Sequence, residues 1–362
     1  MELFGKKKDI DGETSRRITA LRFILIVLVV LIHANLTEDS ALNYYHLDFV
    51  QPAWIGWLKN FVCDSLGGAA VPLFFFFSAY LQFRKNDRYP ILLKKRARTL
   101  LVPYIAWTLL TVLLYFAAQS IPQTAQFFAN PINIVRNWRG LDWLKIFTYH
   151  NLDEGLRPPL VYQFWFLRDL MIFIVLSPLL RLVLVRFPSA FLALCAAYLC
   201  GLPVFITPST GALFFYCAGL LAAEKDVDFF ALSDRLRFGE YLALIAFVEL
   251  VSVFSSAPIG ALKIALYCLF WLKVSRFIIQ SARAYAVAER LSGYSFFLYA
   301  VHTPFLGTAI NKLSWRLIPL HGLGCLAQFV AAGLLTILLG TVGGIVLKRI
   351  CPRAFGLLSG GR

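Results

Sequence analysis

The first long apolar segment, residues 18–36, carries two side chains that could do chemistry, Arg22 and His33. They are eleven residues apart, so on a helix of about 100° per residue they share nearly the same face, separated by a rise of about 16 Å. Ionisable groups inside a membrane indicate a functional site by default. A cation near one membrane surface could hold an anion, and an imidazole deeper in the span is a typical general base.

Each of these two residues also has a purely structural interpretation. An arginine one turn into a span often extends its guanidinium to the lipid headgroups. A neutral histidine inside a bundle can simply hydrogen-bond a neighbouring helix. Their shared face favours a site, with His33 as the base and Arg22 as its companion.

A basic segment follows the second apolar run and holds seven cations against a single acid, Asp87. Such a cluster could bind a polyanion, either lipid headgroups or a phosphorylated donor. Determination of membrane topology is an equally good explanation. The cations are Arg84, Lys85, Arg88, Lys94, Lys95, Arg96 and Arg98.

These residues must be positioned by membrane helices, because 59% of the chain is hydrophobic, 15% is charged and the mean hydropathy is +0.70. We predict an all-α transmembrane bundle over 18–350, preceded by a basic segment, 1–17, and followed by a short tail, 351–362. Pro203 and Pro208 allow either one broken helix or two short ones between residues 190 and 223. Apolar runs long enough to cross a bilayer predict about ten helices, at residues 18–36, 66–83, 99–119, 165–185, 190–206, 211–223, 240–256, 258–275, 293–311 and 323–347.

The distribution of charge predicts orientation and location. Most of the 35 Lys and Arg residues fall in the N-terminal segment, in alternate loops and in the tail, which the positive-inside rule assigns to the cytoplasm. Both termini are then cytoplasmic, and the first run is a retained signal anchor. The net charge of +15 therefore reflects multi-pass topology in a cell membrane, expected to be a bacterial plasma membrane, and argues against nucleic-acid binding.

Other chemical signatures are missing from the sequence. The seven cysteines form neither a CxxC pair nor a disulfide framework, and we expect them to be small apolar fillers. No Walker loop, GxGxxG, HExxH or GxSxG motif occurs. We therefore expect no metal site and no tightly bound cofactor.

Two outward loops, predicted at about 37–65 and 120–164, are long enough to cover a site. Aromatic faces with polar neighbours suit sugar rings, and an aromatic belt at the membrane interface is the alternative. The loops contain Trp54, Trp57, Trp138, Trp143, Tyr149 and Tyr162.

Five segments form an ordered set of motifs along the chain. They are RITALRFILIVLVVLIHANL, VPLFFFFSAYLQFRK, KKRARTLLVPYIAW, YQFWFLRDLMIFIVLSPLL and GYSFFLYAVHTPFL. Together they resemble the acyltransferase 3 family of membrane-bound acyltransferases, over about residues 17–350. Arg22 and His33 match the family's Arg-x10-His catalytic signature, and Trp165, Tyr299 and His302 belong to later motifs that match in order and spacing.

Two elements depart from the family pattern. Ala79 stands where the family usually has glycine, and an RxxR spacing is met only as Lys95 and Arg98. The resemblance implies a ten-helix bundle that moves an acyl group, often acetyl or succinyl, from a cytoplasmic coenzyme A thioester to a hydroxyl of a glycan or other envelope molecule. Acyl-CoA is then a co-substrate, and the glycan acceptor and the lipid bilayer are the other expected partners.

The residues fit this chemistry in a definite way. Lys95, Arg96, Arg98 and Ser78, with Arg22, would bind the acyl donor, with its phosphates at the inner surface and its long thin arm reaching toward His33. His33 would take the proton from the attacking hydroxyl, and a covalent acyl-imidazole on His33 is the other route. The developing oxyanion needs a hydrogen-bond donor, for which the candidates are Ser78, Tyr299 and His302.

Other polar residues in the apolar runs have weaker functional interpretations. His302 precedes Pro304 and could face a cavity where the helix is interrupted, on the acyl-acceptor side with Tyr299. Arg168 and Asp169, which follow Trp165, are adjacent and point about 100° apart, so we expect pairing with other helices first and acceptor contact second.

Glu249 lies in the middle of its apolar run and must be protonated or paired. A satisfied contact between helices is the simpler interpretation, and a proton relay is the other.

A transporter or exporter of a glycan or small envelope metabolite is the main alternative, since ten helices, midplane charges and proline-broken segments also describe secondary transporters. The hydropathy pattern contains no inverted repeat, which favours the enzyme. A purely structural scaffold would leave Arg22 and His33 unexplained. These patterns specify no oligomeric state.

Overall fold

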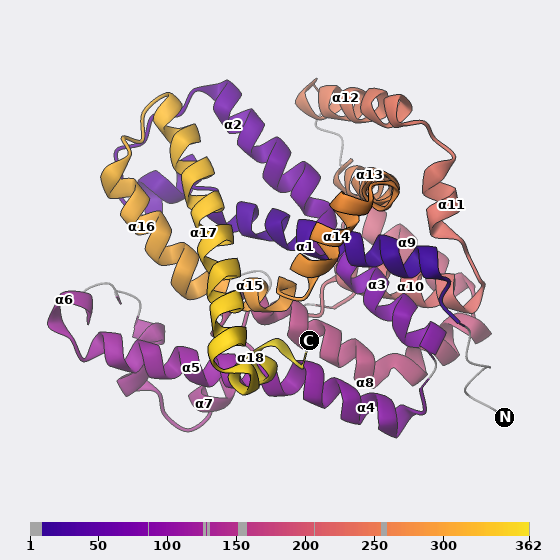
Figure 1. Ribbon diagram of the computed structural model, residues 1–362, viewed down its shortest axis with the longest axis horizontal. Coiled ribbons are helices and arrows are strands. Elements are labelled where there is room, and N and C mark those ends of the chain that lie inside the picture. Colours follow the sequence, from indigo (N-terminus) through magenta and orange to yellow (C-terminus); the bar gives the residue numbers. More distant parts are fainter. Residues whose placement is uncertain are drawn as a thin grey trace.

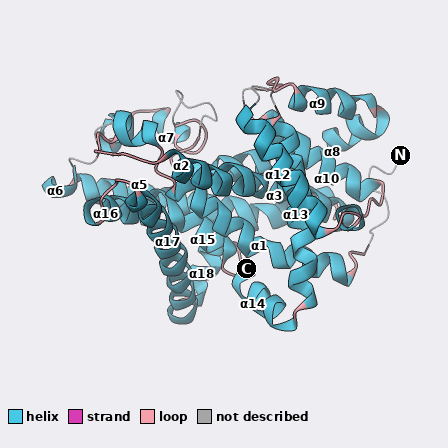
Figure 2. Ribbon diagram, turned by 90° about the horizontal axis from the view of Figure 1, so that it is seen from above, coloured by secondary structure: helices cyan, strands magenta, loops and turns pink. Residues whose placement is uncertain are grey.

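The computed structural model describes residues 9–85, 87–125, 128, 131–150, 158–205, 207–254 and 259–361. In this part of the chain the fold is helical, with no strand and one isolated bridge between Val50 and His321 (Figure 2). This confirms the predicted all-α class. The first eight residues of the predicted N-terminal segment lie outside the described residues.

Helices account for nearly all of the described fold (Figure 1). Two π-helical segments, Phe61–Leu66 and Ala97–Leu101, interrupt longer helical stretches, and the chain is kinked within His302–Leu306. In chain order the helices are α1 (Gly12–Ala34), α2 (Ala53–Asn60), α3 (Ala70–Lys85), α4 (Tyr89–Arg96), α5 (Val102–Gln119), α6 (Pro122–Ala125), α7 (Asp142–Lys145), α8 (Trp165–Arg186), α9 (Ser189–Leu199), α10 (Thr210–Glu224), α11 (Phe229–Asp234), α12 (Phe238–Phe254), α13 (Gly260–Gln280), α14 (Ala282–Ser292), α15 (Ser295–Val301), α16 (Gly307–Leu317), α17 (Leu323–Ile350) and α18 (Pro352–Ser359).

Each of the ten predicted apolar runs contains a helix, but fewer are long enough to cross a membrane alone. By length and composition, four stretches among the described residues qualify: Gly12–Ala34, Ala53–Lys85, Tyr89–Gln119 and Leu323–Ile350. A fifth is counted if Tyr162–Arg186 and Ser189–Leu199, which meet at 106°, form one broken span. Between residues 190 and 223 the chain forms two separate helices, α9 and α10.

The predicted starts of the second and third runs are wrong, because the polar residues that precede each run belong to the helical stretch. The second membrane stretch begins at Ala53 instead of residue 66, so the loop predicted over 37–65 is shorter. Lys59 is tolerated there because its ammonium donates hydrogen bonds to the Leu36 carbonyl and to Gln51 Oε1, both at 2.7 Å. The basic segment before the predicted third run, 99–119, is also helical, since α4 continues through Ala97–Leu101 into α5.

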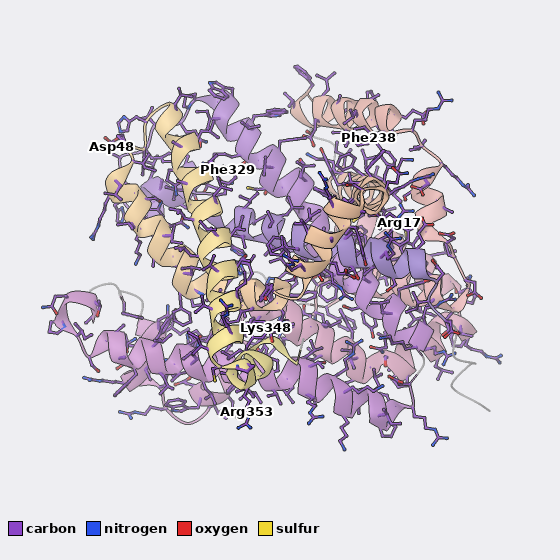
Figure 3. The ribbon with its side chains drawn as sticks, in the orientation of Figure 1. Arg17, Asp48, Phe238, Phe329, Lys348 and Arg353 are labelled. Atoms are coloured by element: carbon purple, nitrogen blue, oxygen red, sulfur yellow. The ribbon has the colours of Figure 1, made fainter. Side chains whose placement is uncertain are left out.

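Helix α1 occupies the centre of the molecule and packs against α3, α13, α14, α15 and α17 (Figure 1). Arg17, near its start, lies inside the fold and is only 1% exposed (Figure 3). Its guanidinium donates to both carboxylate oxygens of Asp234, at 2.8 and 3.1 Å, and to Ser275 Oγ at 2.9 Å. These contacts with α11 and α13 fix the position of α1 at one end.

Small residues let the helices around α1 come close together. A Cβ at Gly340 of α17 would lie 2.6 Å from a methyl group of Leu298, and one at Gly344 would lie 3.0 Å from the Phe297 ring. At Gly219 of α10 a Cβ would overlap the carbonyl of Phe76 in α3. Such small-residue contacts are the usual way in which membrane helices gain packing energy.

The helix that follows Ser295 breaks near Pro304, as predicted. Thr303 has non-helical backbone angles, φ −143° and ψ 153°, which frees carbonyl groups from the helical ladder. The side-chain amide of Gln163 donates to the carbonyls of Ala300, at 3.1 Å, and Thr303. The Tyr299 hydroxyl donates to the Gln163 carbonyl at 2.6 Å. The break is therefore held in a defined geometry beside α8.

The remaining buried ion pairs are structural. Glu249 of α12 pairs with Lys263 of α13 at 3.0 Å and accepts a hydrogen bond from Tyr267 at 2.7 Å. This supports the interpretation of Glu249 as a satisfied contact between helices. The expectation that Arg168 and Asp169 pair with other helices and not with each other is wrong, because the long arginine side chain folds back onto its neighbour at 2.8 Å.

Candidate active site

Two cavities open along one face of α1. The first, here called the Arg22 cavity, has a volume of about 350 Å³ and is lined from α1 by Ile18, Arg22, Ile26 and Val29. The second, the His33 cavity, has a volume of about 220 Å³, and Val30 and His33 contribute to it. The spacing of these residues keeps them on one stripe of a helix. Both cavities therefore lie along the line that joins Arg22 to His33.

Helix α15 and the residue that follows it also contribute side chains to both cavities. Phe296 and Tyr299 line the Arg22 cavity, whereas His302, one turn further on, lines the His33 cavity. The break at Thr303 turns the chain there, so that Thr303, Gly307 and Thr308 also line the second cavity. The linings follow one another along both helices, because Val29 and Tyr299 line the Arg22 cavity whereas Val30 and His302 line the His33 cavity.

The Arg22 cavity combines cations with a long apolar wall. Arg22, Lys85 and Arg96 line it, and among the described residues none of the three has a carboxylate within ion-pair distance. Ser78 and Thr99 add hydroxyl groups. The apolar wall includes Phe74, Phe77, Leu81, Phe166 and Leu170. Unpaired cations at one end of an apolar channel suit an anionic head group with a long uncharged arm.

Only part of the predicted acyl-donor set lies in this cavity. Arg96 and Ser78 line it. Lys95 pairs with Asp87 at 2.7 Å, and Arg98 is exposed; neither lines the cavity. The reason is the helical conformation of the basic segment, because neighbouring residues on a helix point about 100° apart.

The polar end of the His33 cavity contains two imidazoles. The ring centroids of His33 and His302 are 5.2 Å apart, and the Tyr162 ring meets His33 edge-on at 5.9 Å. His302 Nδ1 lies 2.6 Å from the Tyr299 carbonyl. A carbonyl only accepts hydrogen bonds, so Nδ1 carries the hydrogen and Nε2 of the neutral ring carries the lone pair.

The Nε2 atom of His302 is buried and has no hydrogen-bond partner among the described residues. In this tautomer His302 offers an acceptor to the cavity. That geometry does not suit the predicted role of His302 as a hydrogen-bond donor to an oxyanion. It suits a residue that accepts a hydrogen bond from a neighbouring group.

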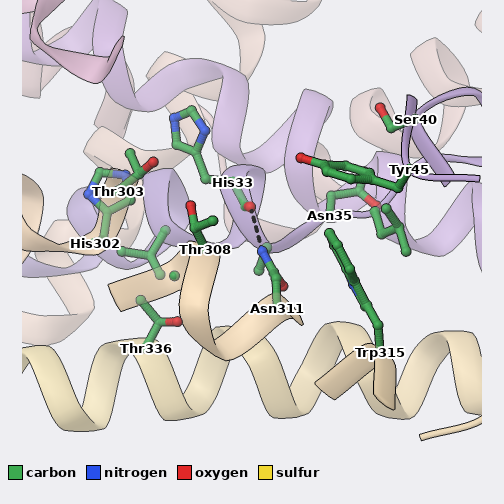
Figure 4. Close-up of a pocket in the computed structure, with 14 residues that line it drawn as sticks. His33, Asn35, Ser40, Tyr45, His302, Thr303, Thr308, Asn311, Trp315 and Thr336 are labelled. Carbon is green, nitrogen blue, oxygen red and sulfur yellow. Dashed lines mark hydrogen bonds between the residues drawn. The ribbon is translucent and has the colours of Figure 1, made fainter. Parts of the chain in front are cut away.

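The other end of the His33 cavity is aromatic and uncharged (Figure 4). The rings of Tyr45 and Trp315 lie 4.6 Å apart at 52°. Asn311 of α16 donates a hydrogen bond to the His33 carbonyl at 3.4 Å. Asn35, Ser40 and Thr336 complete the lining.

Sequence reasoning missed these residues. Tyr45 and Trp315 come from segments far apart in the chain that only the fold brings together. One local feature of the sequence could have indicated this end of the cavity: Asn35 is an amide residue two positions after His33 in the same apolar run. Thr99 is likewise absent from the predicted donor set, and the sequence indicates Lys85 only as one member of the basic cluster.

The remaining predicted site residues lie elsewhere. Tyr299 lines the Arg22 cavity, and Trp165 lines neither cavity but packs near Phe75, with ring centroids 6.4 Å apart. Arg168 and Asp169 are buried and line neither cavity. Arg168 donates to the Thr148 carbonyl and to Thr207 Oγ1, both at 2.8 Å, and so ties two loops to α8.

Most of the six aromatic loop residues predicted to contact a sugar lie away from His33. Trp54 and Trp57 are exposed on α2, and Trp138 is buried in a small cluster with Val135 and Ile146. Tyr162 is the exception, since its ring meets His33. In the described part of the chain no three His, Cys, Asp or Glu residues are grouped as a metal site would require.

Comparison with known proteins agrees with the sequence motifs. The family model described as an acyltransferase domain, of the acyltransferase 3 type, matches residues 15–347. The succinoglycan biosynthesis protein ExoH of Rhizobium meliloti (strain 1021) is 28% identical over 380 aligned residues, covering 97% of this chain and 94% of that protein. No solved structure gives a significant match.

Proposed function

Because this chain belongs to the acyltransferase 3 family of membrane acyltransferases, we propose that it transfers an acetyl or succinyl group from acyl-CoA to a hydroxyl of a cell-envelope glycan. The related protein is named for succinoglycan biosynthesis, which supports a polysaccharide acceptor. We further propose that the chain crosses a bacterial plasma membrane several times with both termini in the cytoplasm. The Arg22 cavity then faces the cytoplasm, and the His33 cavity faces outward.

The observation that carries this proposal is the pair of cavities on one stripe of α1. Coenzyme A carries several phosphates, which need cations, and a long thin arm, which needs an apolar channel. Arg22, Lys85 and Arg96 would bind the phosphates. The arm would pass Ile26 and Val29 and deliver the thioester about 16 Å further along α1, beside His33.

The reaction itself needs one base close to the attacking hydroxyl. His33 would accept the hydroxyl proton while the oxygen attacks the thioester carbonyl. The carbon–sulfur bond then breaks, the acyl group stays on the glycan oxygen, and the leaving thiolate takes the proton from His33. Such a base contributes about 10²- to 10⁴-fold in rate.

His302 would act through His33. With its Nδ1–H held by the Tyr299 carbonyl, its free Nε2 can accept a hydrogen bond from the second ring nitrogen of His33. This interaction would orient the His33 ring and select the tautomer whose other nitrogen faces the hydroxyl, as a third group does in catalytic triads. We assign His302 as a positioning residue and His33 as the catalytic residue.

Radiolabelled acetyl-CoA and succinyl-CoA, incubated with the purified full-length protein in lipid nanodiscs and with envelope glycan, test the proposal. We expect release of coenzyme A and transfer of label to the glycan with one of the two donors. The His33→Ala variant should be inactive at unchanged thermal stability. Substrate counterflow in liposomes without acyl transfer would instead identify a transporter and overturn the proposal.

A further inference from the structure

Resting on the proposed function, we propose that the His33 cavity binds a single uncharged sugar ring, so that the enzyme acylates neutral residues of its glycan and rejects anionic and cationic ones. The cavity volume is about 220 Å³, below the range of roughly 300–1,000 Å³ typical of sites for drug-sized ligands. One pyranose ring, entering with a hydroxyl toward His33, is the ligand that this space suits.

Unsatisfied polar atoms in the lining point to a ligand with hydroxyl groups. Asn35 Oδ1 and Trp315 Nε1 are buried and have no hydrogen-bond partner among the described residues. The amide oxygen accepts hydrogen bonds, and the indole nitrogen donates. Each sugar hydroxyl both donates and accepts, so a ring with several hydroxyls can satisfy both atoms. Buried polar atoms without partners are rare in folded proteins and call for such an explanation.

The aromatic end of the cavity supplies a surface for the carbon–hydrogen face of the ring. Tyr45 and Trp315 stand together at this end, opposite the two histidines (Figure 4). An aromatic side chain with a polar atom offers both apolar contact and a hydrogen bond. Trp315 does both, because its ring and its Nε1 belong to the same wall.

The absence of charge in the lining predicts the selectivity. Apart from the two imidazoles, the residues that line the His33 cavity include no acid and no base. The ammonium of Lys59 is engaged by the Leu36 carbonyl and Gln51, and Lys59 is not among the lining residues. Lys312 and Arg316 follow the lining residues Asn311 and Trp315 but do not line the cavity themselves.

A charged sugar would therefore be buried without an ion-pair partner. A uronate would lose the hydration of its carboxylate, and a protonated amino sugar would lose that of its ammonium, with no opposite charge to compensate. A neutral hexose loses only hydroxyl–water hydrogen bonds, which Asn35 and Trp315 can replace. Charge, more than shape, is the predicted basis of discrimination.

The test compares three acceptors built on the same pyranose ring: methyl glucoside, which is uncharged, methyl glucuronide, which has a carboxylate in place of the C6 hydroxymethyl group, and methyl glucosaminide, which has an ammonium in place of the C2 hydroxyl. Binding to the full-length protein is followed by tryptophan fluorescence in nanodiscs, because alkyl-glycoside detergents would compete for the site. We expect the neutral sugar to bind at least about ten-fold more tightly than either charged one, corresponding to about 1.4 kcal/mol. Equal binding of the glucuronide would overturn the proposal.

Two variants and one control sharpen this test. Trp315→Phe removes a donor while keeping a ring, and should weaken binding of methyl glucoside about ten-fold without changing the KM for acyl-CoA. Asn35→Asp adds a carboxylate, and should shift the preference toward methyl glucosaminide. Trp57→Phe, which changes an exposed tryptophan outside the cavity, should change neither affinity.

The results separate this inference from the proposed function. If envelope glycan is acylated normally but none of the three sugars binds with a dependence on Trp315, the inference is wrong and the enzyme assignment stands. If methyl glucoside binds as expected but no acyl group is ever transferred to glycan, the enzyme assignment is wrong and the sugar site stands.

Discussion

The most direct prediction concerns Arg96, which lines the Arg22 cavity, and Arg98, which is exposed on the same helical segment. Both carry one positive charge, and they are two residues apart. If the cavity holds the phosphates of acyl-CoA, Arg96→Gln removes a charge-assisted hydrogen bond worth about 1.5–3 kcal/mol. The KM for acyl-CoA should then rise about 10- to 150-fold.

Two features of the structure support a rise in KM of this size for Arg96→Gln. Asp87, the acid in the same segment, is already paired with Lys95, so the charge of Arg96 is not neutralised by it. Arg96 is less exposed than Arg98, and charges shielded from water are screened less by salt. The value of kcat at saturating acyl-CoA should stay within about two-fold of the parent, because Arg96 is remote from the reacting atoms.

Initial rates at varied acyl-CoA and fixed glycan, measured at low and at moderate salt, check this prediction. Arg98→Gln is the matched control and should change the KM for acyl-CoA less than about two-fold. Equal increases in KM for Arg96→Gln and Arg98→Gln would refute the reasoning, since a general attraction by the basic surface would then explain both. An unchanged KM in Arg96→Gln would show that the cavity does not bind the donor phosphates.

Three further predictions concern the two histidines of the His33 cavity, the path of the acyl donor and the buried His150. His33→Ala should lower kcat at least about 100-fold, and His302→Ala should lower it less, with part of that loss restored in His302→Gln, which keeps an acceptor. The double variant His33→Ala/His302→Ala should be no slower than His33→Ala, and additive losses would argue against a shared role. Val29→Trp, which enlarges a side chain that lines the Arg22 cavity, should obstruct the path of the donor's arm toward His33 and lower kcat more than about ten-fold while leaving sugar binding unchanged. Normal turnover would mean that the acyl group takes another path. Burial lowers the pKa of His150, which lies outside the membrane stretches, to about 4, so this ring stays neutral in the folded protein. Its contribution to folding stability is therefore complete above about pH 6.5 and is lost as the pH falls toward 4. Hydrogen-exchange protection of residues 131–150 should therefore decrease between about pH 7.5 and pH 5 in the parent and much less in His150→Gln; equal decreases would assign the pH dependence to other groups.

Features that depend on local order along the chain can be predicted from the sequence alone. The phase of a helix is a local property, so eleven residues of spacing were enough to put Arg22 and His33 on one face. Hydropathy located the helices for the same reason, and Pro304 predicted the break that lets His302 reach the cavity. The family motifs identified the chemistry because they are read in order from single segments.

Which residues share a cavity depends on how the helices pack in three dimensions. Arg96 faces the Arg22 cavity while Lys95 and Arg98 do not, because the rotation of a helix about its axis is set by the neighbours against which it packs. Tyr45 and Trp315 meet across 270 residues of chain, and no local pattern specifies such a contact. The tautomer of His302 likewise depends on the Tyr299 carbonyl, which lies just before the break at Thr303. Helix positions follow from each segment's own hydrophobicity, whereas the lining of a site depends on contacts among many segments at once.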